Sequence, residues 1–508
     1  MDYKPLAAVW EITMGCNMRC KHCGSSCKNA LPDELSTEDA LKICDELGSL
    51  GLKWVTISGG EALTRDDWHL IAKKLKENGV TPLLITNGML VDDDVIKKAS
   101  NAGIESFSMS LDGLKETHDF MRMPGSFDKI MSVYDNLEGT NLIKSAITTI
   151  NQKNINELEE IKKILLDKSV KLWQLQIGLP MGNFEKNSDL VLYPEQIDQV
   201  INFAFDSLSD ERITIYLADC LGYYNRKEIK VRDNTFKSQN TIWQGCNAGK
   251  RSFGILHNGD ILGCTSIRDK KYIEGNLLKR SLKEIWEDKK AFSWNRDINK
   301  TDLKGFCSKC GYGDLCLGGC PNTRLTFNKD IYSSNNYCSY YIAIKKAKEK
   351  IMLENNIKKL EIIGKRLLDN NEFQLAELVF EKLITEYPEN IDFLNHYGFI
   401  SYNLKNYFNA QKVNEKVIEV QKNNIYANKG LGLTYVKLGE IDKGIDYLRK
   451  SVEYTDSSYM YPYYDLALTL IDNSRIEEAQ ILINEGLSKT KSFKPMADEL
   501  LNYIESAP

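Results

Sequence analysis

The 508-residue sequence lacks three features that would assign it to a membrane, to export or to nucleic acid. No uninterrupted apolar run is long enough to cross a bilayer, so we expect no membrane span. The amino terminus has no basic region followed by an apolar one and no small-residue cleavage site, which predicts a cytoplasmic protein. A formal net charge of -5 provides no field that would attract a phosphate backbone, so nucleic acid is not an expected partner.

Cysteine, in contrast, is abundant, with 13 residues in the chain. In a reducing compartment, spaced thiols more often bind metal or carry out chemistry than form disulfides. Ten of the 13 cysteines fall into groups with metal-ligand spacing. The chain is also too long for one hydrophobic core, and ordinary domain sizes predict about three domains.

The region from residue 6 to about residue 180 predicts an α/β fold. It alternates amphipathic helical stretches with six β-rich runs, AAVWEITMG, WVTISGGE, TPLLITNG, SFSMSLDG, SAITTI and LWQLQIGLP. Parallel strands joined by helices form an open sheet or a barrel, and in both the functional residues gather at the carboxyl ends of the strands. The motifs MGCNMRC, SGGE, TNG and SLDG lie at those ends, whereas residues 181–245 are less patterned.

The last region, from about residue 346, predicts helical repeats. Small residues recur with successive spacings of 34, 34 and 35, and each precedes a second small residue by 12 positions. The pairs are Gly364 and Ala376, Gly398 and Ala410, Gly432 and Gly444, and Ala467 and Ala479. The pattern resembles the tetratricopeptide repeat, whose arrays form an all-α solenoid that commonly binds peptides or protein tails. An ordinary helical bundle with chance periodicity is the alternative.

The first cysteine motif, C-x3-C-x2-C, is formed by Cys16, Cys20 and Cys23 in the loop after the first predicted strand. Three thiolates can hold three corners of a 4Fe-4S cluster and leave the fourth iron open, whereas a closed zinc site needs four ligands. A zinc site completed by His22 or Cys27 is the alternative.

With this motif the chain resembles the radical S-adenosylmethionine superfamily. The resemblance implies a partial (β/α)6 barrel in which the open iron binds S-adenosyl-L-methionine, and cleavage of this cosubstrate gives a 5'-deoxyadenosyl radical. Ser58, Gly59, Gly60 and Glu61 match the loop that binds the methionine amino group. Further positions that match cosubstrate-binding loops are Asn87, Ser110 and Asp112, together with Arg122 in a segment resembling HDxxR, although Asp112 and Arg122 are also typical surface turn and helix residues. Gln176 ends the sixth strand, where a cosubstrate adenine or a substrate would lie, and a polar strand residue facing solvent is the alternative.

Seven later cysteines, with a C-x2-C-x5-C-x3-C core, resemble the SPASM extension of this superfamily, although two zinc sites would also fit such pairs. The resemblance implies two auxiliary 4Fe-4S clusters, and hence three in total. Cys307, Cys310, Cys316 and Cys338 are expected to ligate the distal cluster, and Cys246, Cys264 and Cys320 the nearer one. Some relatives have an eighth cysteine where this chain has Ser252, so the nearer cluster lacks an obvious fourth ligand. Either a residue such as Cys220 supplies it, or the iron is open to a substrate group, which would favour thioether chemistry.

Together these patterns predict a barrel domain over residues 1–235, an auxiliary-cluster domain over 236–345 and a repeat domain over 346–508. The expected function is oxidation of a peptide or protein substrate, giving a crosslink or an oxidised residue, with a flavodoxin or ferredoxin as electron donor. The repeats are expected to bind the peptide or a partner protein, or to mediate dimerisation. The sequence does not identify the catalytic base. Radical chemistry on a small molecule and a non-catalytic scaffold remain the alternatives.

Overall fold

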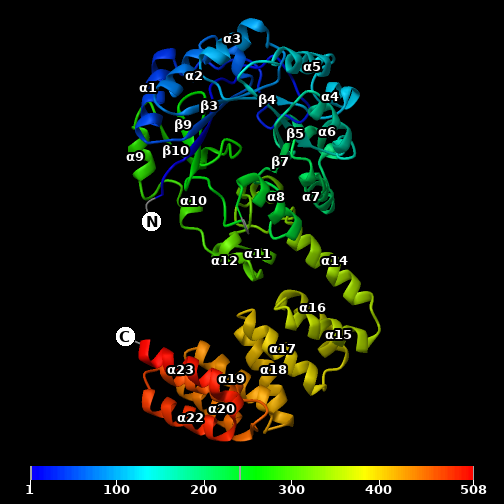
Figure 1. Cartoon of the computed structure of the whole chain (residues 1–508), viewed down its shortest axis with the longest axis vertical. Helices are drawn as coiled ribbons and strands as arrows, with labels where there is room; N and C mark the ends of the chain where they lie inside the picture. Colours follow the sequence, from blue (N-terminus) through cyan, green and yellow to red (C-terminus); the bar gives the residue numbers. More distant parts are fainter. Residues whose placement is uncertain (1–2, 239–241, 507–508) are drawn as a thin grey trace. The chain divides into compact units, whose positions relative to one another are not determined.

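The computed structural model describes residues 3–238 and 242–506, and the chain divides into two compact units, Met1–Ala343 and Ile344–Pro508 (Figure 1). The first unit contains the sheet and every cysteine of the predicted cluster sites. The second unit consists of helices. Among the described residues, no helix has the combined length and apolar character needed to cross a bilayer.

The first unit is built on a ten-stranded sheet with the order β10-β9-β8-β1-β2-β3-β4-β5-β6-β7. The pairs from β8 through β7 are parallel, and β8–β9 and β9–β10 are antiparallel. The strands are β1 Ala7–Glu11, β2 Trp54–Ser58, β3 Thr81–Thr86, β4 Ser106–Ser110, β5 Ile143–Ile150, β6 Leu172–Ile177, β7 Thr214–Leu217, β8 Ser252–Ile255, β9 Asp260–Leu262 and β10 Ile273–Asn276.

Helices connect the parallel strands and lie along the outer side of the sheet (Figure 1). These helices are α1 Thr37–Ser49, α2 Trp68–Glu77, α3 Asp93–Asn101, α4 Lys115–Met121, α5 Ser126–Asn136, α6 Leu158–Asp167, α7 Ile197–Asp206 and α8 Arg226–Phe236. Ser36 caps α1 by accepting a hydrogen bond from the backbone N–H of Asp39 at 3.1 Å. The predicted α/β fold of six strand–helix units resembling a partial barrel is confirmed.

The structure adds a seventh parallel strand in the region that the sequence leaves without pattern. The strand β7 pairs with β6 from Leu172 opposite Thr214 to Leu175 opposite Leu217. It has only four residues, which alternate between half-buried and buried positions. So short a strand carries too little periodicity to be distinguished from a loop. It forms the edge of the sheet opposite to β10, and the auxiliary cysteines follow it in the chain.

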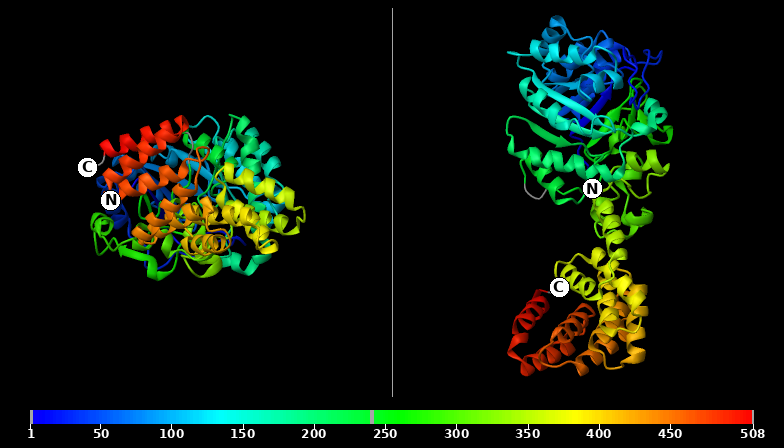
Figure 2. Two further views of the ribbon diagram at one scale, coloured as in Figure 1. Left: turned by 90° about the horizontal axis from the view of Figure 1, so that it is seen from below. Right: turned by 90° about the vertical axis from the view of Figure 1, so that its right-hand side faces the viewer.

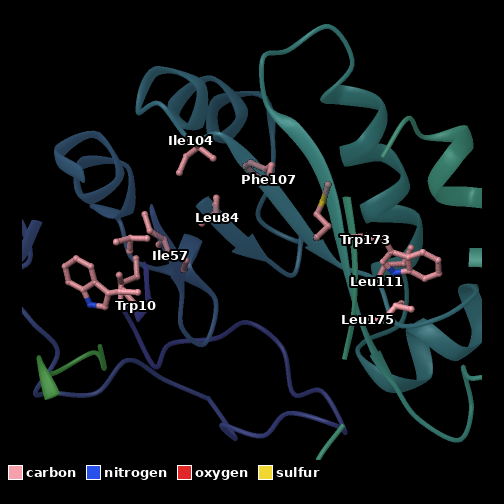
Figure 3. Packing of buried hydrophobic residues seen from close by; sticks show 14 of the residues in the cluster. Trp10, Ile57, Leu84, Ile104, Phe107, Leu111, Trp173 and Leu175 are labelled. Atoms are coloured by element: carbon pink, nitrogen blue, oxygen red, sulfur yellow. The ribbon is translucent and has the colours of Figure 1, made fainter. Parts of the chain in front are cut away.

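The apolar core lies between this sheet and its helices (Figure 3). Trp10, Ile57, Leu84, Phe107 and Trp173 come from five strands and are each 0% exposed. Burial of such side chains contributes about 1.5–3 kcal/mol each to the stability of the sheet. The core therefore fixes the strands whose carboxyl ends carry the polar motifs.

The auxiliary cysteine region follows as short elements after β7. They are β8–β10, α9 Leu282–Glu287, α10 Ser293–Arg296, α11 Gly305–Lys309, α12 Gly313–Cys316, α13 Pro321–Asn328 and the start of α14 Ser339–Leu353. Because β8 pairs with β1 in parallel, this region continues the barrel sheet.

The second unit contains four helix pairs and a final helix, and Figure 2 shows them from two sides. The pairs are α15 Ile357–Asp369 with α16 Phe373–Glu386, α17 Ile391–Asn403 with α18 Tyr407–Val420, α19 Ile425–Lys437 with α20 Ile441–Tyr454, and α21 Tyr461–Asp472 with α22 Ile476–Lys489, followed by α23 Lys494–Ser506. A Cβ atom on Gly432 would lie 2.9 Å from the carbonyl oxygen of Gly444, so the small residues do permit close packing of paired helices. The predicted repeat fold is confirmed.

Candidate functional site

The three cysteines of the first motif lie in the loop between β1 and α1 and line one cavity of about 140 Å³. Most of the predicted cosubstrate residues line the same cavity, namely Ser58, Gly59, Gly60, Glu61, Asn87, Ser110 and Arg122. Asp112 is fully buried behind Arg122, and Gln176 lines a different, larger cavity. The carboxyl ends of β1 to β4 thus converge on the thiols, as parallel strands predict.

The two glycines after β2 allow the cysteine loop to pack directly on them. A Cβ atom on Gly60 would lie 2.1 Å from the carbonyl oxygen of Gly15, and one on Gly59 would lie 2.5 Å from that of Thr13. The backbone N–H of Gly60 donates to Thr13 at 2.8 Å, and that of Glu61 donates to Gly15 at the same distance. Glycine is therefore required here for contact between two protein loops, whatever ligand the cavity holds.

Glu61 is 2% exposed and ties three loops together. Its Oε1 accepts from the hydroxyl of Thr86 at 2.7 Å, and its Oε2 accepts from the backbone N–H of Asn87 at 2.7 Å. Asn87 in turn donates through Nδ2 to Asn17 in the cysteine loop at 2.7 Å. Burial raises the pKa of Glu61, and the hydrogen bonds from Asn87, Thr86 and Leu63 oppose that rise. Both carboxylate oxygens thus have protein partners.

Asp112, His22 and Arg122 form a buried charged group beside the thiols. Asp112 Oδ2 lies 2.5 Å from Arg122 Nε and 3.0 Å from His22 Nε2, and Asp112 Oδ1 accepts from the backbone N–H of Thr149 at 2.7 Å. Burial alone would raise the pKa of Asp112, but the adjacent Arg122 and His22 outweigh it and hold this pKa well below its usual range. Arg122 Nη1 lies 3.8 Å from Cys20 Sγ, so Arg122 connects the carboxylate to a predicted cluster ligand.

The thiols themselves differ in their surroundings. Burial raises the pKa of Cys16, and it raises that of Cys20 to about 11 despite the nearby Arg122. A hydrogen bond from the Cys27 thiol, with further backbone hydrogen bonds, lowers the pKa of Cys23 to about 5. Cys27 thus lowers the pKa of Cys23. From its position in the sequence, Cys27 is expected only as an alternative zinc ligand.

A second cavity, of about 810 Å³, lies between the cysteine loop and the auxiliary cysteines. Gln176 is part of its wall and donates through Nε2 to Thr149 Oγ1 at 3.1 Å. Cys264 and Cys320 lie on its other side. His22 and Ser25 line both this cavity and the smaller one, so the two adjoin.

The wall of the larger cavity is mostly neutral. Its polar side chains on β5, β6 and β7 are amides and hydroxyls, namely Thr149, Gln174, Gln176, Thr214 and Tyr216. Among the described residues that line the cavity, Asp219 is the carboxylate and Arg232 the guanidinium. Arg232 Nη1 lies 3.7 Å from Asp219 Oδ1. The cavity is therefore suited to an uncharged part of a substrate.

An adjoining hollow of about 1210 Å³ shares Asp219, Arg232 and Phe236 with this cavity but is cationic. Lys4, Lys250 and Arg251 line it, and within residues 3–238 and 242–506 none of the three forms an ion pair. A substrate that extends from the neutral cavity into this hollow would gain from carrying negative charge there.

The four cysteines predicted for the distal cluster line one small cavity of about 20 Å³. They are Cys307, Cys310, Cys316 and Cys338. Aromatic rings enclose them, with Tyr224 stacked on Tyr312 at a centroid distance of 4.0 Å. Four thiols around one enclosed space provide a complete ligand set for a cluster.

The three cysteines predicted for the nearer cluster are close enough to interact electrostatically. Both Cys320 and Cys264 affect the pKa of Cys246 electrostatically. Burial raises the pKa of all three thiols. Asp219, just beyond β7, acts on each of the three, and Cys220 acts on Cys320. Ser252, which replaces the eighth cysteine of some relatives, begins β8 opposite Ala7 and is not part of the wall of either large cavity.

Arg324 provides a test of whether iron–sulfur clusters fit these thiols. Its side chain is 0% exposed, and its Nε and Nη1 have no acceptor among the described residues. Burial lowers its pKa, while the charges of Cys307, Cys320 and Cys246 oppose that effect. A buried cation needs a negative counter-charge, and thiolate-ligated clusters at both cysteine sets would supply it. Across the described residues, no three His, Cys, Asp or Glu side chains are placed to hold a single metal ion. The unpartnered donors of Arg324 thus fit thiolate-ligated clusters at these cysteines.

Comparison with known proteins assigns the class. Residues 10–165 match the radical SAM superfamily, residues 246–311 match the iron–sulfur cluster-binding domain SPASM, and residues 427–457 match a tetratricopeptide repeat. The three segments thus match the radical SAM, SPASM and tetratricopeptide-repeat families that the sequence motifs resemble. Such domains bind 4Fe-4S clusters and S-adenosylmethionine.

Curated relatives include proteins with different substrates. An AdoMet-dependent heme synthase from Methanosarcina barkeri is 27% identical over 353 residues, covering 67% of this chain and 98% of the relative. The mycofactocin maturase MftC from Mycolicibacterium smegmatis is 26% identical over 319 residues, covering 62% of this chain and 78% of the relative. Neither match spans the whole chain.

Solved structures share the fold. Streptococcus suis SuiB bound to S-adenosylmethionine superposes with a TM-score of 0.54 at 16% identity, covering 66% of this chain and 77% of SuiB. A native anSMEcpe structure with bound AdoMet and the Kp18Cys peptide gives a TM-score of 0.54 at 19% identity, covering 68% of this chain and 98% of that one. At these identities the likeness establishes the barrel and auxiliary fold.

Proposed function

We propose that this protein is a peptide- or protein-oxidising radical SAM enzyme with one catalytic and two auxiliary 4Fe-4S clusters. Cys16, Cys20 and Cys23 hold the catalytic cluster in this proposal. The distal auxiliary cluster is held by the four cysteines around the small aromatic cavity, and the nearer one by Cys246, Cys264 and Cys320. When bound, these groups supply reductive cleavage of S-adenosylmethionine, hydrogen-atom abstraction from the substrate and acceptance of the electron that is then released.

The residues of the smaller cavity bind and orient the cosubstrate in this proposal. Ser58, Gly59 and Gly60 present backbone groups to its amino end, while Glu61 holds their loop against the cysteine loop. Arg122 offers its remaining guanidinium face to the carboxylate, with Asp112 fixing its orientation. Asn87 and Ser110 complete the wall.

The neutral wall of the 810 Å³ cavity is the observation that supports a peptide side chain as the reacting group. Gln176 and its neighbours on β5 to β7 can hydrogen-bond amides without imposing charge, and the cavity lies between the catalytic and auxiliary cysteines. The repeat unit adds a second reason, because tetratricopeptide arrays commonly bind extended segments. The three-domain division and a flavodoxin or ferredoxin donor belong to the same proposal.

A small-molecule substrate is the second candidate, and two observations favour it. The heme synthase matches over nearly its whole length, and the cationic hollow beside Asp219 could hold a molecule with several carboxylates. Against it, the reaction cavity itself offers few charges, as described above.

The test is anaerobic reconstitution followed by two measurements on one sample. The proposal predicts about 12 irons per chain, with matching sulfide, together with formation of 5'-deoxyadenosine. Candidate peptides are then compared, by mass spectrometry, with an iron porphyrin that carries several carboxylates as the alternative substrate. Loss of two hydrogens from a peptide supports the proposal, whereas turnover of the porphyrin alone would establish the second candidate. Stoichiometric zinc without cleavage would refute both.

A further inference from the structure

We propose that Cys220 supplies the fourth thiolate of the nearer auxiliary cluster, which closes that cluster to direct binding of substrate. The inference rests on the proposed function, because it requires that the nearer cluster exists. It concerns a cysteine outside the SPASM motif, in the loop that follows β7.

Cys220 shares a wall with the nearer set of thiols. It lines the 810 Å³ cavity together with Cys264 and Cys320. It is also close enough to Cys320 for that thiol to affect its pKa electrostatically. Cys246 interacts in turn with Cys320 and Cys264. Four cysteines thus gather where the SPASM pattern provides three, and cysteine thiolate is the usual ligand of a 4Fe-4S cluster.

The loop that carries Cys220 is fastened to both auxiliary sites. The hydroxyl of Tyr223 accepts from the backbone N–H of Cys320 at 2.8 Å and donates to the carbonyl of Asp219 at 2.6 Å. On its other side, the backbone N–H of Ser339 donates to the carbonyl of Gly222 at 2.9 Å. These contacts bracket Cys220 and hold its backbone beside Cys320.

The same loop adopts a costly backbone conformation. Gly222, Tyr223 and Tyr224 have φ values of 101°, 76° and 57°, so two tyrosines lie in the left-handed region. Such a conformation is unfavourable for a tyrosine and persists where the surroundings determine it. Tyr223 is 0% exposed, so its buried ring and hydroxyl supply that constraint.

The alternative protein ligands are Ser252 and Asp219, of which Asp219 acts on all three nearer thiols. Ser252 lies in β8 and lines neither cavity that contains the nearer cysteines. Asp219 already faces Arg232 at 3.7 Å, and its side chain is 56% exposed. The unpartnered donors of the buried Arg324 favour a site with more thiolate charge, since this cation interacts with Cys320 and Cys246. On ligation the Cys220 thiol releases its proton to solvent and its sulfur takes the fourth coordination position.

The experiment uses the full chain with Cys16, Cys20 and Cys23 replaced by alanine, so that the auxiliary clusters alone remain. This parent should retain about eight irons. Its reduced EPR spectrum is recorded with and without cyanide as an exogenous iron ligand, and compared with those of Cys220→Ala and Cys220→Ser variants. Cys44→Ala is the matched control, because Cys44 is a fully buried cysteine within α1.

We expect cyanide to leave the EPR spectra of the parent and of the Cys44→Ala control unchanged. The Cys220→Ala variant should show changed g values for one cluster and respond to cyanide, or lose about four irons with an unchanged far-UV circular dichroism spectrum. The Cys220→Ser variant, which offers an oxygen ligand, should show a shifted reduction potential. A parent that already responds to cyanide, or a Cys220→Ala spectrum identical to that of the parent, would overturn the assignment. So would an Asp219→Ala variant that alone opens the cluster.

Iron content distinguishes a failure of the three-cluster proposal from a failure of the Cys220 assignment alone. A parent that retains only about four irons lacks the nearer cluster, which refutes the three-cluster proposal and the ligand assignment together. A parent with about eight irons and an open site refutes the assignment of Cys220 alone. In that case direct coordination of a substrate thiol, and thus thioether chemistry, becomes the better interpretation.

Discussion

The two cysteine regions of the first unit are supported in contrasting ways. The loop with Cys16, Cys20 and Cys23 is braced by a fully formed network, in which Gly60 packs on Gly15 and Glu61 and Asn87 tie neighbouring loops to it. In the auxiliary region, Cys307 and Cys316 instead lie in helices of five and four residues, and the buried Arg324 has no protein acceptor for its Nε and Nη1 among the described residues. A loop built by protein contacts should survive loss of its metal, whereas a region stabilised through thiols should not.

The largest effect should come from removing the catalytic ligands. Replacing Cys16, Cys20 and Cys23 by alanine should abolish formation of 5'-deoxyadenosine and remove about four of about 12 irons. Because the surrounding network does not depend on the thiols, the protein should remain folded by circular dichroism. Residual cleavage above background would show that another residue provides the site.

Metal removal should then separate the two regions. After iron is chelated from the holoprotein, amide hydrogen exchange should rise by about tenfold or more in residues 305–338. Exchange in β1 to β6 should change little, because the apolar core holds those strands. Equal protection of residues 305–338 with and without iron would contradict the dependence on metal.

Breaking the buried charged group should cost less, but still a large fraction of the stability. An Asp112→Asn substitution leaves Arg122 buried without its carboxylate partner, and should lower the free energy of unfolding by about 3–5 kcal/mol. All seven tryptophans lie between residues 10 and 294, so their fluorescence reports on the first unit during urea unfolding.

The matched control is Asp128→Asn, which removes an exposed partner of Lys115. Its cost should be about 0–1 kcal/mol, as for surface ion pairs in general. Similar costs for the two variants would mean that Asp112 and Arg122 are not coupled as the distances indicate.

Part of the candidate site can be predicted from the sequence, but some of its contacts cannot. Spacing places the cysteines in sets, and strand ends bring Ser58, Glu61, Asn87 and Ser110 to one cavity. Spacing does not show that Asp112 and Arg122 bind one another, because that contact depends on how α4 packs after β4. Gln176 lies at a strand end like the others, yet it lines the larger cavity.

Other features carry no local signal at all. The strand β7 is too short for its alternation to stand out, and Tyr223 resembles any loop aromatic until its hydroxyl is seen between Asp219 and Cys320. His22 occupies a position within the cysteine motif, but only the fold shows that it lines both cavities. Tertiary placement, and not residue type, distinguishes these residues from their neighbours.

A pH effect should reveal the packing beneath the catalytic loop. Burial lowers the pKa of His118 to about 4, from an unfolded value near 6.5. Above pH 6.5 both states leave the imidazole neutral. As the pH falls toward 4 the unfolded state binds a proton that the folded state excludes, so up to about 3 kcal/mol of stability is lost. Urea unfolding between pH 7 and 5 measures this slope, and a His118→Gln variant should flatten it. An unchanged slope would assign the effect to other groups.

The smallest expected effect concerns the repeats. Tyr426 and Tyr461 begin the first helices of consecutive repeats, are 52% and 51% exposed, and flank Tyr459. If the array binds peptide there, replacing both by alanine should weaken peptide binding by about tenfold while leaving cosubstrate cleavage unchanged. Tyr193→Ala, at 64% exposure in the first unit, is the control. Unchanged affinity in a titration would place recognition elsewhere.

The pairing of β8 with β1 has a kinetic consequence. The strand that leads into the catalytic cysteine loop is hydrogen-bonded along Ala7 to Trp10 with the strand that precedes Cys264. Electron tunnelling slows steeply as donor and acceptor move apart, and a hinge between the two would make the transfer rate fluctuate with domain motion. A shared sheet allows no such hinge. If clusters occupy both cysteine sites, as proposed, the shared sheet sets the spacing between them and keeps it constant through each turnover.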